Sequence, residues 1–302
     1  MLGIGNDCMA PIYLPLSHVD PKYNDKTKYL RMRCGHCLNC KVARTKEWSL
    51  RLAMEATQYQ PGEIAFVTLT FSEENVWTVN QETGELVKTL WVRDVQTYMK
   101  RVRTNLKRTF GFTGKVRYYA CGEYGPKTHR PHYHLLVFGI PTIFQSVLDE
   151  SWNYGFTCIK PFFPETCIYV AGYIQKKLYG EVGSFVYEGI EPPFSCCSHH
   201  LGEDWFFKPS NYDNIVHNGF VMFQGYKHAI PKAFRRKMIA LGDLTKMDAY
   251  DLYLQQKDEV VKLGDACRAQ GISLSHYFKC FREDSVARHL RYNVKRNKEF
   301  EL

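Results

Sequence analysis

Apolar residues recur along the chain at spacings that predict alternating helices and strands between residues 41 and 180. Apolar positions three or four apart predict helices at 41–59, 92–110, 143–154 and 165–179. Runs rich in aromatic and β-branched residues predict strands at 64–71, 116–121, 130–139 and 155–160. This order predicts an α+β domain with a largely antiparallel sheet, whose helices cover one face and leave the other open for a ligand.

The two ends of the chain are less regular. Prolines at 11, 15 and 21 predict an irregular N-terminal stretch up to about residue 30. After residue 181 the pattern predicts loops, including one at 195–200, and then a helical region from about 244. We therefore divide the chain into a cysteine-containing N-terminal extension with a basic helix (1–60), a core (61–180) and a C-terminal extension (181–302).

Composition indicates a packed protein with an affinity for polyanions. The 302 residues are 45% hydrophobic and 15% aromatic, which is ample material for a core. The formal net charge of +9 suits nucleic acid as a partner. The basic residues gather at 31–51, 100–117, 176–177 and 227–237, so they would either line a channel or lie on solvated helix faces.

The sequence also predicts where the protein works. It contains no stretch of about 18 apolar residues, so we expect no membrane span. The first seven residues lack the charged start and apolar stretch of a signal peptide, which favours the cytoplasm. In that compartment the 11 cysteines are expected to be thiols or metal ligands rather than disulfides.

The strand at 130–139 carries the first candidate site. His132 and His134 are two positions apart, so both imidazoles face one side of the strand and Tyr133 faces the other. Two aligned imidazoles make half of a metal site. The alternative is that both are polar residues on the wet face of an antiparallel strand.

Glu123 ends the preceding strand, and its carboxylate would lie near the imidazoles if the two strands pair. Two imidazoles and one carboxylate leave open positions on Mn²⁺ or Mg²⁺ that phosphate oxygens can fill. Zn²⁺ accepts the same ligands, so ligand type leaves the metal open. Glu123 taken alone is equally consistent with an ordinary turn carboxylate.

The helix at 165–179 carries the second candidate group. Tyr169 and Tyr173 are one turn apart on the same helical side, and Lys176 or Lys177 can share that side. A tyrosyl oxygen near a divalent cation can attack phosphorus and form a phosphotyrosine bond. Nearby positive charge would help to supply the phenolate, whose pKa is ordinarily about 10. The alternative is that both tyrosines pack against a core.

Taken together, these motifs resemble a known superfamily. The order of Phe-Val-Thr-Leu-Thr at 66–70, Gly-Glu at 122–123, His-x-His at 132–134 and Tyr-x₃-Tyr-x₂-Lys at 169–176 resembles the His-hydrophobic-His (HUH) endonucleases. These include rolling-circle replication initiators, relaxases and related transposases. Tyr133, where an aliphatic residue is usual, is the one departure.

Within the superfamily, the chain resembles most the replication initiators of the Microviridae, of the gokushovirus type. The added support is Cys8 near Pro11, the cysteines at 34–40, an Arg/Trp helix at 44–51 and a basic segment at 230–236. The resemblance implies an HUH-endonuclease-like core with an antiparallel sheet. It implies that the protein nicks single-stranded DNA at a replication origin through a 5′-phosphotyrosine intermediate and religates it.

The resemblance also implies residue roles. His132, His134 and Glu123 would hold Mn²⁺ or Mg²⁺, and Tyr173 would be the nucleophile. Tyr169 would accept DNA in a second transfer. The helper lysine would be Lys176 by pattern or Lys177 by helical reach. Four arginines are further DNA-binding candidates, and they are Arg44, Arg51, Arg117 and Arg130. The protein would act in the cytoplasm of a bacterial host, with host replication proteins such as a helicase as further partners.

The cysteines need a separate interpretation. Cys34, Cys37 and Cys40 are too close together for a zinc site built from two separated pairs, but they supply three thiolates. Cys8 or His36 could be a fourth ligand of a structural zinc ion. The alternatives are free buried thiols or an iron–sulfur cluster, which would need a fourth nearby cysteine. The cluster Cys196-Cys197 with His199-His200 carries no assignment.

Two other functions stay open from the sequence. One is a transposase or relaxase of the same superfamily, which would move element ends. The other is a non-catalytic module that binds single-stranded nucleic acid through a basic groove and stacked aromatics, for which Tyr118, Tyr119 and Tyr133 are candidates.

Overall fold

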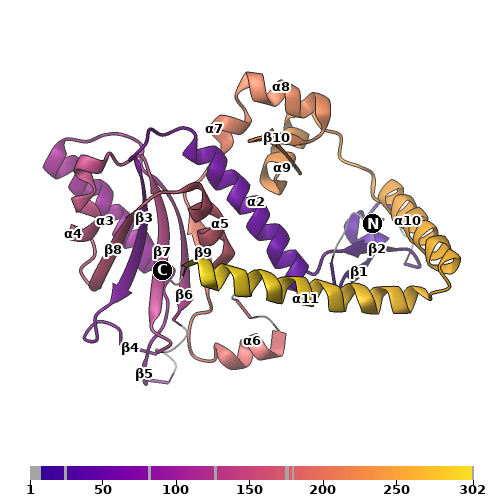
Figure 1. Ribbon diagram of the computed structural model, residues 1–302, viewed down its shortest axis with the longest axis horizontal. Helices are drawn as coiled ribbons and strands as arrows, with labels where there is room; N and C mark the ends of the chain where they lie inside the picture. Colours follow the sequence, from indigo (N-terminus) through magenta and orange to yellow (C-terminus); the bar gives the residue numbers. More distant parts are fainter. Residues whose placement is uncertain are drawn as a thin grey trace. The chain divides into compact units, whose positions relative to one another are not determined.

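The strands of the core form one antiparallel sheet in the order β8-β3-β7-β6-β9 (Figure 1). This computed structural model describes residues 8–23, 26–80, 83–125, 128–173, 177–178 and 180–300. The strands of the sheet are β3 (Ile64–Phe71), β6 (Arg117–Tyr124), β7 (Pro131–Phe138), β8 (Gly155–Pro161) and β9 (Phe194–Cys197). The strand with both histidines, β7, is therefore central, with β3 on one side and β6 on the other.

Helices cover both faces of this sheet (Figure 1). One face packs against α3 (Val92–Phe110) and α4 (Ser146–Glu150), and the other packs against α2 (Leu38–Ala56) and α5 (Pro164–Gly172). The prediction that one face stays open was therefore wrong. The reason is that successive side chains of β3 are apolar on both sides, with Val67 and Leu69 facing α3 and Ile64 and Phe66 facing α2 and α5.

The segment after residue 180 is more ordered than predicted. It begins with α6 (Gly180–Val186), and the predicted loop at 195–200 starts instead as the edge strand β9, which pairs with β6. Cys196 and Cys197 in β9 pack into opposite cores, which removes them as a joint metal site. The further elements are β4 (Thr78–Val79), β5 (Leu86–Val87), η1 (Thr142–Phe144), α7 (Glu203–Phe206), α8 (Pro209–Asn218), β10 (Val221–Phe223), β11 (Tyr226–His228) and α9 (Lys232–Leu241).

A buried ion pair ties α2 to the sheet. Glu55 is fully buried, and both its carboxylate oxygens accept hydrogen bonds from Arg117 Nη1, at 3.0 and 2.9 Å. Arg117 Nη2 lies 2.9 Å from Asp204, and the Gly202 amide donates to Glu55. Breaking such a pair from one side typically costs about 3–5 kcal/mol, because it leaves a buried charge without a partner.

The chain divides into two compact units, Thr45–Leu241 around the sheet and a second unit made of Met1–Arg44 with Gly242–Leu302. This differs from the three consecutive segments predicted, because the two ends of the chain pack together. The second unit contains β1 (Ile12–Pro15), α1 (Leu16–Val19), β2 (Tyr29–Met32), α10 (Ala249–Ala269) and α11 (Leu274–Phe300).

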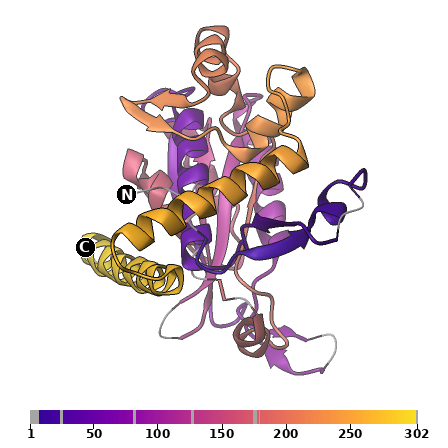
Figure 2. The ribbon, with the colours of Figure 1, turned by 90° about the vertical axis from the view of Figure 1, so that its right-hand side faces the viewer.

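Helix α10 lies beside the β1–β2 hairpin within this second unit (Figure 2). Arg31 in β2 exchanges two hydrogen bonds with the Gln256 side chain, its amide donating at 2.8 Å and its carbonyl accepting at 3.1 Å. Leu16, Leu30 and Ala249 form the buried centre. Within the described part of the chain, no helix is both long enough and apolar enough to cross a membrane.

Candidate active site and cysteine cluster

The sheet face under α2 and α5 changes from apolar to polar along its strands, and the candidate site lies where it becomes polar. On β7, Phe138 and Leu136 are buried in the core, while His134 and His132 follow on the same face. The adjacent strands change in the same way, from Phe66 to Thr68 and Thr70 on β3 and from Cys121 to Glu123 on β6. Alternation and register thus bring the polar residues of three strands together.

Glu123 and the histidines meet as predicted. Glu123 pairs with His132 in the β6–β7 register, and its Oε1 atom lies 2.9 Å from Nε2 of His134. Both Glu123 and His134 are buried, at 6% and 8% exposure. Tyr133 points to the opposite side of the sheet, where its hydroxyl donates to Asp94 at 2.6 Å.

Two threonines orient the imidazoles. The hydroxyl of Thr68 lies 3.1 Å from Nδ1 of His134, and the hydroxyl of Thr70 lies 2.9 Å from Nδ1 of His132. Each threonine stands directly opposite its histidine in the β3–β7 register. Sequence reasoning missed this role, although a Thr-x-Thr spacing that matches the His-x-His spacing was its signal.

The Nε2 atom of His132 lies beside Gly125. A Cβ atom added to Gly125 would lie 3.0 Å from this nitrogen, which is tighter than ordinary contacts. The absence of a side chain at this position therefore leaves room for the outward-facing edge of the imidazole.

Helix α5 places the two tyrosines over the histidine pair. Pro164 occupies the first turn of α5, and Thr166 Oγ1 accepts a hydrogen bond from the Phe163 amide, which fixes where the helix begins. Tyr173, directly after α5, stacks on His134 with ring centroids 4.3 Å apart and planes 4° apart. Its hydroxyl donates a hydrogen bond to the hydroxyl of Tyr169. The shared helical side predicted for the tyrosines is confirmed.

The surroundings of Tyr173 keep it protonated. The residue is only 4% exposed, and this burial raises the pKa of its hydroxyl above the ordinary value near 10. The negative charge of Glu123 raises this pKa further, as does the neighbouring Tyr169. The neutral phenol is therefore the resting form of Tyr173.

The structure separates the predicted basic residues. Lys176 lies outside the described residues, while Lys177 is partly exposed shortly after Tyr173. Arg117 and Arg51 are largely buried, Arg117 in its ion pair with Glu55 and Arg51 against the Trp48 and Phe234 rings. These two placements argue against direct contact with DNA.

The other two arginines differ from this pair. Arg130 donates a hydrogen bond to the Phe71 carbonyl at 3.0 Å and forms an ion pair with Glu73. Arg44 is exposed, in the second unit. Of the four arginines, Arg44 is therefore the one most available to DNA.

The donor atoms at the histidine site fit a divalent cation. Two ligands of one ion, each about 2.1 Å from it and at right angles, are about 3 Å apart. Nε2 of His134 and Oε1 of Glu123 have this separation, and the threonine contacts at Nδ1 leave the Nε2 atoms as the ligating nitrogens. His132, whose Nε2 lies beside Gly125, is not drawn into one tight group with the other two.

The four cysteines of the second unit, in contrast, form such a group. The sulfur atoms of Cys8, Cys34, Cys37 and Cys40 all lie within 4.8 Å of one another. Three of the sulfur pairs are 3.5, 3.7 and 4.0 Å apart, close to the roughly 3.8 Å between sulfurs of a tetrahedral zinc site with Zn–S of about 2.3 Å. The cluster could hold a metal ion, and its fourth member is Cys8 rather than the exposed His36.

Local structure explains how the cysteines meet. The β1–β2 hairpin brings Cys8, just before it, to Cys34, just after it. Gly35 adopts a left-handed conformation with φ of 79°, and in the turn that follows the Cys37 amide donates to Cys34 Sγ at 3.2 Å. Cys40 then lies in the first turn of α2, whose dipole favours a thiolate.

Comparisons with known proteins agree with this site. A family model of replication-associated proteins of the ORF2 kind matches residues 64–178, a range that contains Glu123, both histidines and both tyrosines. The replication-associated protein ORF2 of Spiroplasma virus 4 is 27% identical over 266 residues, covering 81% of this chain and 78% of its own length.

Two further relatives are more distant. The replication-associated protein ORF4 of Chlamydia phage 1 is 22% identical over 76% of this chain, and VP4 of Bdellovibrio phage phiMH2K is 24% identical over 67%. The chain spans 59% and 65% of the lengths of these two relatives. No solved structure matches the chain.

These similarities define the class as phage replication-associated proteins. Within it, the chain belongs to the gokushovirus-type replication initiators, the family that its motifs predicted.

Proposed function

We propose that the protein starts rolling-circle replication by cutting single-stranded DNA at an origin through a 5′-phosphotyrosine bond, and that it later rejoins the strand. The observation that carries this proposal is the stack of Tyr173 on His134, which is itself bonded to Glu123. A tyrosyl oxygen is thereby held beside a set of imidazole and carboxylate donors. The HUH-endonuclease-like core is part of the same proposal.

The reaction needs no cofactor to balance. The Tyr173 oxygen attacks phosphorus, the bond from phosphorus to the 3′-oxygen breaks, and the leaving oxygen gains a proton while the phenol loses one. Attack by a 3′-hydroxyl on the phosphotyrosine restores the diester. Tyr169, whose hydroxyl contacts that of Tyr173, is placed to accept DNA in a second transfer. Lys177, or Lys176, would stabilise the phenolate.

Residues His132, His134 and Glu123 would hold Mn²⁺ or Mg²⁺. A bound divalent ion would polarise the scissile phosphate and offset the charge that develops on it. Thr68 and Thr70 fix the imidazole rings by hydrogen bonds to Nδ1, which keeps Nε2 available as a ligand.

We assign the cysteine cluster to a structural zinc ion. Four thiolates satisfy a tetrahedral site and leave no open position, as in structural rather than catalytic zinc sites. The Cys34 amide also donates to Cys8 Sγ at 3.3 Å, and the Met9 amide donates to Cys37 Sγ at 3.4 Å. Such contacts favour the charged sulfur that zinc requires.

The relatives are phage proteins, so we place this activity in the cytoplasm of an infected bacterial cell, on single-stranded DNA at the replication origin. A host helicase stays a predicted partner.

The other two functions have less support. Tyr118, Tyr119 and Tyr133, which a base-stacking module would need exposed, are only 9%, 1% and 0% exposed. A transposase is disfavoured because the relatives carry replication names.

Covalent capture of DNA tests the proposal. Incubation with single-stranded origin DNA and Mn²⁺ should give a protein–DNA adduct that survives SDS, with the attached tyrosine identified by mass spectrometry. Tyr173→Phe should lower single-turnover adduct formation by more than about a thousandfold. Tyr226→Phe is the matched control, because Tyr226 lies in β11 and is 72% exposed. An unchanged adduct in the Tyr169→Phe/Tyr173→Phe double variant would show that the nucleophile is elsewhere.

A further inference from the structure

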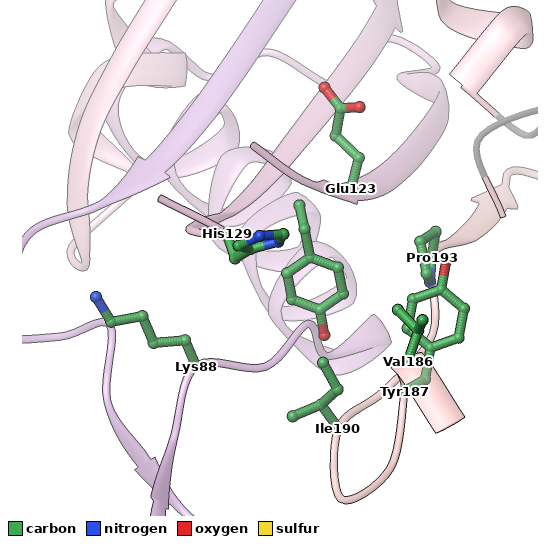
Figure 3. A pocket seen from close by; sticks show the side chains of 8 residues that line it. Lys88, Glu123, His129, Val186, Tyr187, Ile190 and Pro193 are labelled. Atoms are coloured by element: carbon green, nitrogen blue, oxygen red, sulfur yellow. The ribbon is translucent and has the colours of Figure 1, made fainter. Parts of the chain in front are cut away.

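A pocket of about 370 Å³ opens at the end of β6, and Glu123 is part of its wall. In Figure 3, Glu123 lies at one end and Ile190 at the other, with His129 on one side and Tyr187 and Pro193 on the opposite side. The pocket therefore adjoins the candidate active site through a shared residue. Its lining residues are Lys88, Glu123, Tyr124, His129, Val186, Tyr187, Ile190 and Pro193.

The wall of the pocket combines flat apolar surfaces with a few polar groups. The rings of Tyr124 and Tyr187 are nearly parallel, with planes 24° apart and centroids 6.5 Å apart. Val186, Ile190 and Pro193 add aliphatic surface. The polar groups are His129 and Glu123, since the Lys88 ammonium pairs with Glu73 at 3.7 Å and points away in Figure 3.

Hydrogen bonds hold this wall in place before any ligand binds. The Asn80 side chain donates to the Gly189 carbonyl at 2.9 Å, and the Glu191 amide donates to the Thr89 hydroxyl at 2.8 Å. The Tyr124 hydroxyl donates to the Glu191 carbonyl at 2.6 Å. The loop after α6 is thereby fixed to the strands, so a ligand does not have to order it on binding.

A second contact joins the pocket to the segment that follows the tyrosines. The Leu178 amide donates to the Tyr187 hydroxyl at 3.2 Å. Leu178 is the neighbour of Lys177, one of the two lysines proposed to assist the nucleophile. A ligand in the pocket would therefore contact both Glu123 and a tyrosine that is bonded to this segment.

We propose that the pocket receives one unpaired base of the single-stranded DNA next to the phosphate that is cut. A base has flat faces that stack on aromatic rings and polar edges that hydrogen bond, and single-stranded nucleic acids are commonly read in this way. The volume is at the small end of the usual range of about 300–1,000 Å³, which suits one nucleotide and excludes a duplex. This inference rests on the proposed function, because that function supplies the DNA.

Binding measurements with and without bases test the proposal. The probes are a homopolymeric thymidine oligonucleotide and an abasic oligonucleotide of equal length, bound without divalent ions by the Tyr169→Phe/Tyr173→Phe protein, which cannot cut. Tyr187→Ala should raise the Kd for the thymidine probe about tenfold and leave the Kd for the abasic probe unchanged. Tyr187→Phe, which retains the ring, should keep most of the affinity.

The outcomes separate this inference from the proposed function. Equal weakening of both probes, or no weakening of either, would overturn the base pocket even if adduct formation proceeds normally. Selective weakening of the thymidine probe would support the pocket even if no adduct ever forms. Circular dichroism of each variant checks that it is folded.

A second measurement does not depend on folding of the variants. A single-stranded probe carrying iodouracil is irradiated with the unaltered protein, and the cross-linked peptides are mapped by mass spectrometry. Cross-links within residues 186–193 or at Tyr124 support the pocket. Cross-links confined to other segments overturn it, including the case in which a protein segment rather than a base occupies the pocket.

Discussion

The cysteine cluster and the histidine–tyrosine site are both suited to a cation, yet they differ in what surrounds the donor atoms. Four sulfurs surround one point in the cluster, with all of them within 4.8 Å of one another. At the other site one imidazole and one carboxylate are in direct contact, and a second imidazole is held on the same strand by Thr70. Two tyrosine hydroxyls lie beside them.

This difference indicates different roles. A complete set of protein ligands leaves no position for a substrate, so the cluster stabilises the fold around it. An incomplete set of nitrogen and oxygen donors leaves positions for phosphate oxygens, so the histidine site can act on DNA. The comparison therefore predicts that loss of one site changes stability and loss of the other changes chemistry.

The largest effect is expected from Cys34→Ser. Structural zinc in small domains binds with an apparent free energy of about 10–16 kcal/mol, and most of it is folding free energy. We expect loss of bound zinc and faster hydrogen exchange in residues 29–40, with exchange in β3, β6 and β7 unchanged. Cys158→Ser is the control, since Cys158 is an exposed cysteine in β8. Unaltered zinc content in Cys34→Ser would contradict a structural role.

His132→Ala should give the opposite result. Removing one metal ligand should slow single-turnover adduct formation by about a hundredfold or more, because the cation that polarises the phosphate is held less well. Zinc content and thermal stability should stay as in the unaltered protein. His217→Ala, at an exposed position in α8, provides the control. Equal losses in both variants would mean that the histidine has no specific part in the reaction.

Sequence patterns predicted best what is local. The strand 64–71 and the helix 92–110 have the predicted bounds, because apolar periodicity and flanking glycines act within a few residues. The pairing of Glu123 with the histidine strand followed from a short hairpin between β6 and β7. The motifs of the candidate site were found in the same way, since each lies within one element.

Long-range contacts were not predictable. The two hydrogen bonds between Arg31 and Gln256 join residues that lie far apart in the chain, and neither residue carries a pattern that indicates the other. The cover on the second sheet face depends likewise on how α2 and α5 pack. Thr70 was visible in the strand, but its contact with His132 depends on the β3–β7 register.

The smallest and most specific effect is expected from Thr70→Val. Valine has nearly the shape of threonine and suits a strand, but it cannot bond to Nδ1 of His132, which now lies 2.9 Å from the Thr70 hydroxyl. Partners of this kind typically contribute about 10–100-fold to metal affinity or activity. The Mn²⁺ concentration for half-maximal adduct formation should therefore rise about tenfold or more, with little change at saturating Mn²⁺. Thr70→Ser retains the hydroxyl and should behave like the unaltered protein. If serine and valine shift the Mn²⁺ requirement equally, the hydroxyl is not what holds His132, and the site differs less from a simple polar surface than the comparison requires.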